Sequence, residues 1–592
     1  MAKQKPRNYR NRGNNSNNPK DKVKDRDRDG KYNSKVNHDT RKSSSGKDGV
    51  YPIVTGSSDN DATWYVPNGQ MVKDVATFPV AFQSGLPVPV KNTSSLKATP
   101  RVNLGWATTP GIIRYDIMPT IAADMEDTTS PLSVAAGSLY QAIQSANSRT
   151  PSYEPADMMM YLVALTHAFS YYQWLVRVYG CIKNYEFQDR YTPEVLIQSM
   201  GVDYKSVSTH MADFRTGINN MAAIMASLYM PKTIDYSNRQ IFLYESIYRD
   251  SNSPKAQYYY YNPVGFYVWQ EGPTSAPDTH LTQLSLSNVL RQNDDASARD
   301  EQRKLVGIGY EELIDFGMSM VFALRNSEDI RMIGADMLQA FGTQSLFQVY
   351  PIAETFSVTP VYNPEVLSQM ENAYISPCAE WKTISNTITQ NTDINGGYLQ
   401  NVITYNDWDN EFDTVRGSLD NFRPEQYMVN FHKENVLPED ILVATRLTQV
   451  PQFIWQSATA TRVVTRQTEI VVGATIFMYT VNSISSGVVD FSVSQFPIHS
   501  YMMIQDANYE DPAEFFEYID PMAHLSKFDW HPRVRLFTMS QEGAITPNRV
   551  SQFFFDLDNY VLMGQSNLHN LNYTCLLGLF TPKSLTNAIM LK

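Results

Sequence analysis

The stretch PADMMMYLVALTHAFSYYQWLVRVYG, residues 155–180, decides the fold of this chain. Its apolar side chains recur at alternating steps of four and three, which is the spacing of an α-helix. Pro155 and Asp157 suit the first turn of a helix, and Gly180 suits its end. The positions between the periodic ones are also apolar, and a helix that is apolar on nearly every face is usually buried. The stretch therefore predicts a long helix at the centre of a large core. Its periodic positions are Met158, Leu162, Leu165, Phe169, Tyr172, Val176 and Tyr179.

Further helices are predicted on both sides of this stretch. Apolar residues at helical spacing mark residues 132–143, after Pro131, and residues 211–229, before Pro231. Two more such segments are residues 311–323 and 329–341. The chain up to about residue 345 is therefore predicted to be mainly helical.

The composition changes after about residue 350. Residues 383–401 are polar and rich in Thr and Asn, and we expect such segments at exposed loop tips. Three runs of β-branched residues follow at 462–465, 470–472 and 474–481, and they predict strands. Gly473 separates the last two runs. The whole chain is thus predicted to be α+β.

Two other segments are assigned from their composition, because they lack a regular period. Residues 75–120 are rich in Pro and lack periodicity, so we expect extended chain that lies along a neighbouring surface, on an adjacent subunit. Residues 258–261, YYYY, and 266–269, FYVW, are dense in aromatic side chains. Such clusters form either a contact patch between subunits or part of a core, and the sequence leaves both open.

Charge is distributed unevenly along the chain. The 592 residues carry a formal net charge of −12. Residues 1–50 hold 15 Lys and Arg against 6 Asp, a net of +9, which leaves −21 for the rest. The first 50 residues have almost no large apolar side chain, so we expect them to form a disordered basic arm. A basic arm on an acidic body indicates contact between the arm and a polyanion.

The arm is predicted to bind RNA through its cationic side chains. No element that reads bases is visible, so binding is expected to neutralise phosphates without sequence preference. The alternative is a solvated tail with no partner. The candidate RNA-binding residues are Lys3, Lys5, Arg7, Arg10, Arg12, Lys20, Lys22, Lys24, Arg26 and Arg28.

No metal, cofactor or disulfide framework is predicted. The three cysteines, Cys181, Cys378 and Cys575, are odd in number and far apart. Residues 25–30, DRDRDG, copy half of a calcium loop, but Val36 stands where the loop needs a bidentate Glu. His167 lies in the apolar helix and is expected to be a core residue. There is no apolar leader at the N-terminus and no uninterrupted run of 18 apolar residues.

Catalytic motifs are also missing from the sequence: we find no phosphate-binding loop, nucleophile elbow or HExxH pair. We therefore do not predict an enzyme. Three hypotheses remain: a self-assembling shell protein, a nucleoprotein that coats single strands, and an enzyme of unrecognised type. The acidic body disfavours a strand-coating protein, because such proteins carry a positive groove in the body.

A block from residue 60 to residue 180 resembles the capsid proteins of picobirnaviruses. The resemblance begins with NDATWY at 60–65, Asp74, Phe78-Pro79 and Gly85. It continues through PGI at 110–112, PTI at 119–121, TSPL at 129–132, VAA at 134–136 and SAN at 145–147. It ends with YEPADMMMYL at 153–162 and RVYG at 177–180.

The resemblance implies a structural protein rather than an enzyme. It implies a mainly helical shell domain and a β-containing projecting domain, with dimers assembling into a small icosahedral shell of T=1 symmetry around genomic double-stranded RNA. Besides the coat protein itself and the viral RNA, it implies an enclosed viral RNA polymerase and contact with a host membrane during entry as partners. The expected locations are the virion and, during assembly, the host cytoplasm.

Composition and resemblance together predict four parts. Residues 1–59 form the basic arm, 60–345 the helical shell domain and 346–540 the β-containing projecting and dimerisation domain. Residues 541–592 form a C-terminal segment that returns to the shell domain.

Overall fold

The structure is a computed structural model, and every residue it describes belongs to the compact unit Val54–Lys592. The residues described are 89–91, 102–104, 110–123, 130–183, 192–253, 256–272, 279–285, 307–375, 384–391, 397–405, 426–457, 460–485, 488–505, 522–539 and 545–581.

The stretch quoted above forms α4 (Pro155–Ile182), the longest helix described. All of its residues are buried except Pro155, Asp157 and Gln173, which confirms the predicted central helix. Gly180 does not end the helix, which continues for two more residues. Glu154 and Asp157 cap its first turn.

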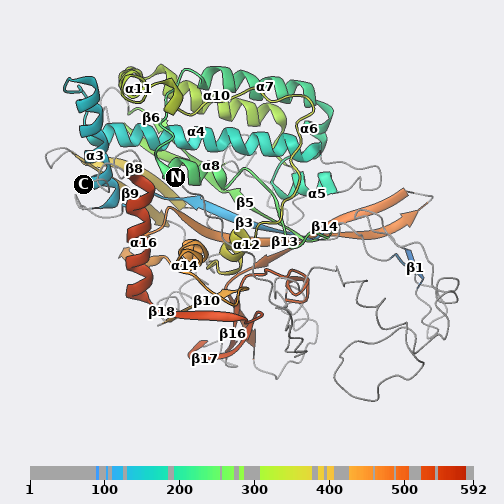
Figure 1. The fold of residues 1–592 in the computed structure, drawn as a ribbon. Helices are drawn as coiled ribbons and strands as arrows, with labels where there is room; N and C mark the ends of the chain where they lie inside the picture. Colours follow the sequence, from blue (N-terminus) through green and yellow to red (C-terminus); the bar gives the residue numbers. More distant parts are fainter. Residues whose placement is uncertain are drawn as a thin grey trace, which may run out of the picture. The chain divides into compact units, whose positions relative to one another are not determined.

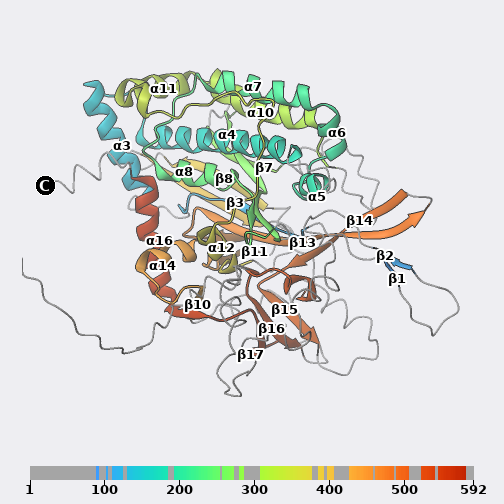
Figure 2. The same cartoon turned by 45° about the vertical axis from the view of Figure 1, so that its right-hand side comes forward.

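Other helices surround α4 and form a layer with it (Figures 1 and 2). The predicted helices are confirmed as α3 (Pro131–Asn147), α7 (Met211–Met225), α10 (Tyr310–Asn326) and α11 (Glu328–Phe341). Their starts lie within one residue of the expected positions. Three short helices complete the layer: α5 (Thr192–Ser199), α6 (Tyr204–Thr209) and α8 (Asp235–Phe242).

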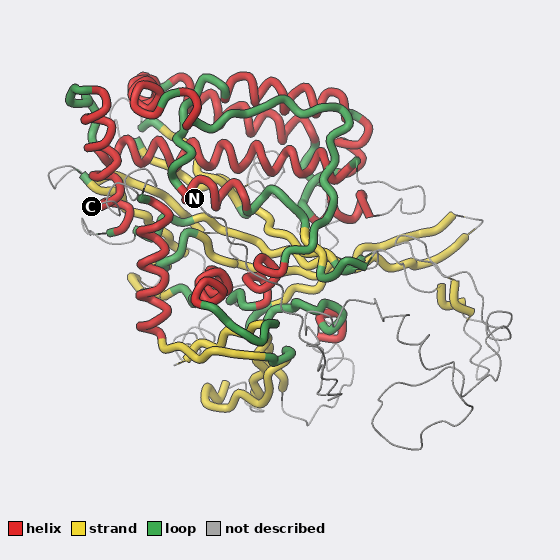
Figure 3. The backbone as a smooth tube through the Cα atoms, viewed as in Figure 1, coloured by secondary structure: helices red, strands yellow, loops and turns green. Residues whose placement is uncertain are grey.

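Two sheets lie against this layer (Figure 3). The five-stranded sheet has the order β14 (Val488–Ile498), β13 (Glu469–Ser485), β3 (Ile112–Pro119), β5 (Tyr258–Pro263) and β4 (Tyr248–Arg249). The six-stranded sheet has the order β11 (Gln452–Ser457), β12 (Ala460–Val464), β9 (Tyr398–Tyr405), β8 (Ile384–Asn391), β7 (His280–Ser285) and β6 (Gly265–Gln270).

The sheets correct three details of the sequence analysis. The runs 470–472 and 474–481 are one strand, β13, because Gly473 marks a bulge and not a break. Most of the polar stretch 383–401 forms β8 and the start of β9, and its Asn386 and Asn401 are buried, so it is not an exposed loop tip. The end of the Pro-rich segment, β3, pairs with β13 and β5 of the same chain and not with an adjacent subunit.

The remainder of the Pro-rich segment lies mainly outside the described residues. Within it, β1 (Pro89–Lys91) pairs with β2 (Val102–Leu104) in an antiparallel hairpin. The aromatic clusters are core: Tyr259, Tyr260 and Tyr261 on β5, and Phe266 and Tyr267 on β6, are fully buried. The alternative of a contact patch is wrong, because these strands lie beneath the helices.

The chain after residue 360 contributes two smaller groups of elements. One contains α12 (Pro364–Glu371), α14 (Pro438–Ala444), α16 (Gln565–Phe580) and the antiparallel pair β10 (Gln426–Phe431) and β18 (Asn559–Gly564). The other is a sheet of β15 (Tyr501–Gln505), β16 (Val534–Met539) and β17 (Ile545–Phe554). Short 3-10 turns lie at Thr343–Ser345 and Thr445–Leu447.

Among the described residues, buried apolar side chains form a main core and a small cluster. The main core is centred on α4 and extends from Ile112 to Phe580 along the chain. The small cluster is separate and comprises Tyr427, Val429, Phe431, Ala444, Val450, Met563 and Leu568. α16 contributes to both, since Leu568 belongs to the small cluster and Phe580 stacks on Tyr236 of the main core at 4.8 Å between ring centroids.

Within the described part of the chain, no helix has the length and apolar character needed to cross a membrane.

Candidate functional site

The ten candidate RNA-binding residues, Lys3 to Arg28, lie outside the described residues, as does the half calcium loop at 25–30. Cys181 and Cys575 are described and are free thiols, the first of them buried in α4. RNA binding by the arm therefore stays a prediction, and the described sites lie in the body of the protein.

His167 is a core residue, as predicted. It is buried in α4, its Nε2 lies 3.2 Å from the hydroxyl of Tyr236, and its ring packs edge-on against Tyr267. Burial lowers the pKa of His167 to about 3. A neutral imidazole in an apolar site can stabilise packing but carries no charge at physiological pH.

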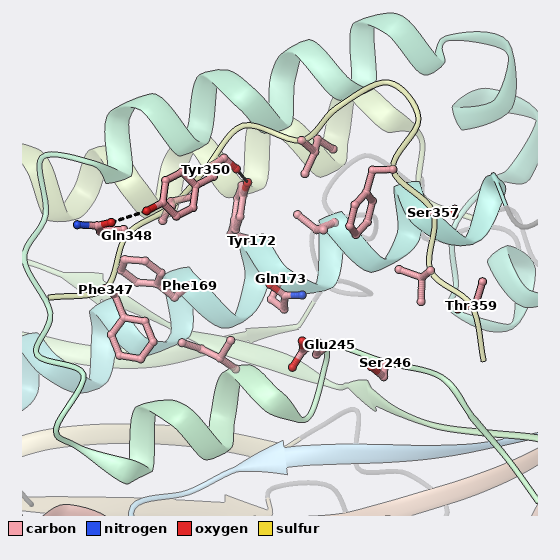
Figure 4. A pocket seen from close by; sticks show the side chains of 16 residues that line it. Phe169, Tyr172, Gln173, Glu245, Ser246, Phe347, Gln348, Tyr350, Ser357 and Thr359 are labelled. Carbon is pink, nitrogen blue, oxygen red and sulfur yellow. Dashed lines mark hydrogen bonds between the residues drawn. The ribbon is translucent and has the colours of Figure 1, made fainter. Parts of the chain in front are cut away.

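A cleft of about 450 Å³ opens beside α4 (Figure 4). Its floor includes Phe169, Tyr172 and Gln173 of α4, and its far side includes Glu245 and Ser246 after α8. The outer wall is residues 346–361, a segment without regular structure that we call the strap. The lining mixes aromatic rings with a few polar groups, and among the described residues that line it only Glu245 is charged.

The strap is tied to α4 along its length. Tyr172 donates a hydrogen bond to the carbonyl of Tyr350 at 3.0 Å, and Tyr179 donates one to the carbonyl of Glu354 at 3.1 Å. The amide of Val358 donates to the carbonyl of Gly180 at 3.1 Å. A Cβ atom at position 180 would lie 2.5 Å from Val358 Cγ2, so this crossing requires glycine. Gly180 therefore serves the close approach of the strap.

A buried polar network joins the two sheets. Asn386 of β8 donates to the carbonyl of Pro119 at 2.9 Å and accepts from the hydroxyl of Tyr267 at 2.7 Å. Asn401 of β9 donates to the same Asn386 oxygen at 2.7 Å and accepts from the amide of Ile121 at 3.2 Å. These amides satisfy backbone groups where β3 ends, which an apolar side chain could not do.

A buried ion pair fixes α8 to β13. Arg239 Nη2 and Glu469 Oε1 lie 2.8 Å apart, and Glu469 is 2% exposed. Burial opposes the charge on Arg239, but the carboxylate of Glu469 outweighs it and raises the pKa of the guanidinium. Loss of either partner would leave a buried charge without compensation.

Asp250 connects the main sheet to the segment 522–530. It accepts from the amide of Gln257 at 3.1 Å, and its other oxygen lies 3.5 Å from the hydroxyl of Tyr259. That hydroxyl accepts from the amide of Trp530 at 3.1 Å. Burial, together with the nearby charge of Asp529, raises the pKa of Asp250 to about 7.

The indole of Trp530 faces a second ionic group, at the small cluster. His432, which follows β10, packs edge-on against Trp530 at 4.2 Å between ring centroids. Its Nδ1 lies 2.7 Å from Asp558 Oδ2, and its Nε2 lies 3.2 Å from Glu371 Oε1. Burial alone would lower the pKa of His432, but the two carboxylates outweigh it and raise the pKa to about 9.

These sites are built to hold elements together. Among the described residues, no group of three or more His, Cys, Asp and Glu side chains is arranged to bind a metal ion. The carboxylates of Glu371 and Asp558 contact different ring nitrogens of His432. The three side chains therefore connect α12, β10 and β18. The geometry supports a rigid scaffold.

Comparison with known proteins gives the family. The sequence model described as "Picobirnavirus, Capsid protein" matches residues 64–543, which is most of the chain. The chain belongs to the picobirnavirus capsid protein family. The predicted resemblance is confirmed, and a capsid protein is a structural component of the virion.

Two relatives agree with this assignment. The chain is 24% identical over 432 residues to the capsid protein precursor of Human picobirnavirus (strain Human/Thailand/Hy005102/-), which covers 70% of this chain and 73% of that protein. A solved X-ray structure of the picobirnavirus capsid is similar in fold, with a TM-score of 0.69 at 19% identity. The similarity covers 89% of this chain and 99% of the solved chain.

The central helix follows from the sequence, whereas the ionic groups have no local signal in it. Arg239 and Glu469, or His432 and Asp558, are separated by more than 100 residues and form no local motif. The sequence carried one signal, and it concerns the buried polar network. Asn386 and Asn401 stand in strands whose other residues alternate between apolar and polar. A buried strand position occupied by Asn requires a polar partner.

Proposed function

We propose that this protein assembles as dimers into a small icosahedral shell of T=1 symmetry that encloses double-stranded RNA. The observation that carries the proposal is the extent of the family match, residues 64–543, together with the shared fold over 99% of a solved capsid chain. A body with a net charge of −21 supports a shell wall better than an RNA-coating surface.

The basic arm is the proposed RNA contact. Ten Lys and Arg side chains between Lys3 and Arg28 would neutralise phosphates without reading sequence. An arm of 50 residues reaches at most about 165–180 Å when extended. This reach is sufficient for the arm to follow RNA inside a shell while the body stays in the wall.

The proposed division of the body is a shell part, 60–345 with 541–592, and a projecting part within 346–540. Packing of α16 against α3 and α8 supports the return of the C-terminal segment. Strands β8, β9 and β11 to β14 share sheets with β3 and β5 to β7. We therefore place the projection in those segments of 346–540 that lie outside the two large sheets.

The remaining partners follow from the family. We propose that the shell encloses the viral RNA polymerase, contacts a host membrane during entry, and assembles in the host cytoplasm.

Assembly is tested by expressing the full chain and examining the purified protein by negative-stain microscopy and light scattering. Closed particles of uniform diameter are expected. Filaments that form only with added single-stranded RNA would contradict the proposal and indicate a strand-coating protein.

The arm is tested in the same particles by the RNA that survives nuclease treatment. Replacing the ten basic residues by Gln should leave the particles intact and remove most of the RNA. The matched control replaces Asp21, Asp25, Asp27 and Asp29 by Asn, which alters the same segment but should retain RNA. Equal RNA content in the Gln variant and the native protein would overturn the role of the arm.

A further inference from the structure

Among the strands that the structure describes, β18 (Asn559–Gly564) lies at the edge of its sheet. It pairs on one side with β10, from Gln426 opposite Gly564 to Phe431 opposite Asn559. No other strand in the described ranges pairs with it, so its second edge has no sheet partner there. Figure 1 shows the strand leading into the lower end of α16.

The other edge of this two-stranded sheet, on β10, is closed. Asn372, just after α12, accepts from the amide of Asn430 at 2.8 Å and donates to its carbonyl at 2.9 Å. The side-chain amide thus takes the place of a neighbouring strand on β10. β18 has no such substitute among the described contacts.

Proteins protect exposed strand edges with charged residues, Pro or bulges, because a free edge invites pairing with another chain. The sequence of β18, NYVLMG, contains none of these. Its pairing with β10 is also regular over all six positions. The strand therefore has the features of a pairing site and none of the features that prevent pairing.

The outward face of β18 is apolar as well. Side chains alternate along the strand: Met563 is buried in the small cluster, whereas Tyr560 and Leu562 are 49% and 51% exposed. Leu557, just before the strand, is 46% exposed. Three large exposed apolar side chains thus lie within the six residues from 557 to 562. A gathered patch of this kind marks an interaction surface.

We propose that β18 pairs with β18 of a second copy of this chain, antiparallel about a two-fold axis, and so extends the two-stranded sheet to four strands. This contact rests on the proposed self-assembly and assigns one surface to it. A capsid wall surrounds each subunit with copies of itself, and a two-fold contact uses the same strand twice.

The chemistry of the strand suits such self-pairing. Because no residue from 559 to 564 is charged, a two-fold contact brings no like charges together. With Val561 on the axis, Tyr560 of one copy lies opposite Leu562 of the other on the outward face. Aromatic and aliphatic side chains in directly opposed positions stabilise antiparallel pairs. The nearest acid, Asp558, is already held by His432.

The test compares two lysine substitutions at exposed leucines near the small cluster. Leu562→Lys places a charge on the free edge. Leu442→Lys changes a side chain that is 39% exposed and belongs to α14 instead of β18. Sedimentation velocity over a concentration series measures self-association, and circular dichroism checks that both variants fold. We expect Leu562→Lys to weaken dimerisation by about tenfold or more and Leu442→Lys to leave it nearly unchanged.

Cross-linking provides a second measurement that does not depend on the lysine variant folding. In a background that carries Cys378→Ser and Cys575→Ser, the pair Tyr560→Cys and Leu562→Cys should form a disulfide-linked dimer on mild oxidation if Val561 lies on the axis. A dimer from Leu562→Cys alone would place Leu562 on the axis and also support the pairing.

The outcomes separate this inference from the proposed function. If native particles form, Leu562→Lys associates like the native protein and neither cysteine variant cross-links, the β18 contact is overturned and the capsid function stands. If the native chain does not self-associate at all, both are overturned.

Discussion

The main core around α4 and the small cluster around β10 use the same kinds of side chain but differ in how completely they are covered. α4 packs against helices, strands and the strap, and even its polar Thr166, Ser170 and Arg177 are buried. The small cluster has seven buried members on and beside a two-stranded sheet, and Tyr560 and Leu562 of that sheet are about half exposed. A large core can bury polar groups completely. A small core depends for its stability on ionic groups that lie near the solvent.

The ionic groups of the two regions show the same difference. Arg239 and Glu469 are enclosed beneath the helices, where an ion pair is strong but loss of one partner is costly. The small cluster relies on His432 between two carboxylates and on Lys433 beside Asp440, near solvent. We therefore expect damage to the main core to be global and damage to the small cluster to be local.

The largest effect is expected from a charge in the main core. Leu165→Asp places a carboxylate at a fully buried position of α4, which costs several kcal/mol or forces rearrangement. The protein should fail to fold, as measured by soluble yield and far-UV circular dichroism. Val429→Asp, its counterpart in the small cluster, should leave the helical layer folded and expose 426–447 to proteolysis. Equal global unfolding by both variants would break the distinction between the two regions.

The two ion pairs are expected to differ in the free energy of unfolding. Arg239→Met should cost about 3–5 kcal/mol, because Glu469 stays buried and unpaired. Lys433→Met should cost at most about 1 kcal/mol, since Lys433 is 46% exposed. Denaturant titration measures both. The double variant Arg239→Met with Glu469→Leu should recover much of the loss, and no recovery would show that packing and not charge accounts for it.

Asp250 should make the attachment of segment 522–530 depend on pH. Its pKa rises from the ordinary 3.8 to about 7 on folding, so the protonated form is favoured in the folded protein. The stabilisation is complete below about pH 4 and is lost as the pH rises through about 7. The loss is on the order of 4 kcal/mol. This loss is measured by amide hydrogen exchange at Phe528 to Trp530 between pH 4 and 8. The exchange rates are corrected for the intrinsic dependence of exchange on pH. Asp250→Asn should remove the dependence, and an unchanged profile in that variant would assign it to another group.

His432 should give the small cluster a separate pH range. Its pKa is raised from 6.5 to about 9, so its stabilisation is complete below about pH 6.5 and is lost as the pH rises through about 9. We expect a loss on the order of 3 kcal/mol, confined to α12 and to the strands β10 and β18. Hydrogen exchange of these strands from pH 6 to 10 measures it, with His432→Gln as the control. Loosening of α4 in the same range would contradict the local effect.

Local pattern was sufficient for the helices because their signal repeats over many turns. α4, α3, α7, α10 and α11 were all expected from apolar spacing, and their starts agree with the structure. Strands were predicted less well, since their pairing partners are distant in sequence. The segment that contains β3 was expected to lie on an adjacent subunit, but β3 pairs with β13 and β5 of its own chain.

The sequence by itself determined the buried central helix, the uneven charge and the family. Each of these depends on residues that are neighbours along the chain or on their totals. The tertiary structure decided the role of Gly180, the burial of Asn386 and Asn401, the pairing of Arg239 with Glu469, and the open edge of β18. These depend on which segments meet after folding, and a polar residue in a sequence does not reveal whether its partner will be water, a carboxylate or a backbone carbonyl.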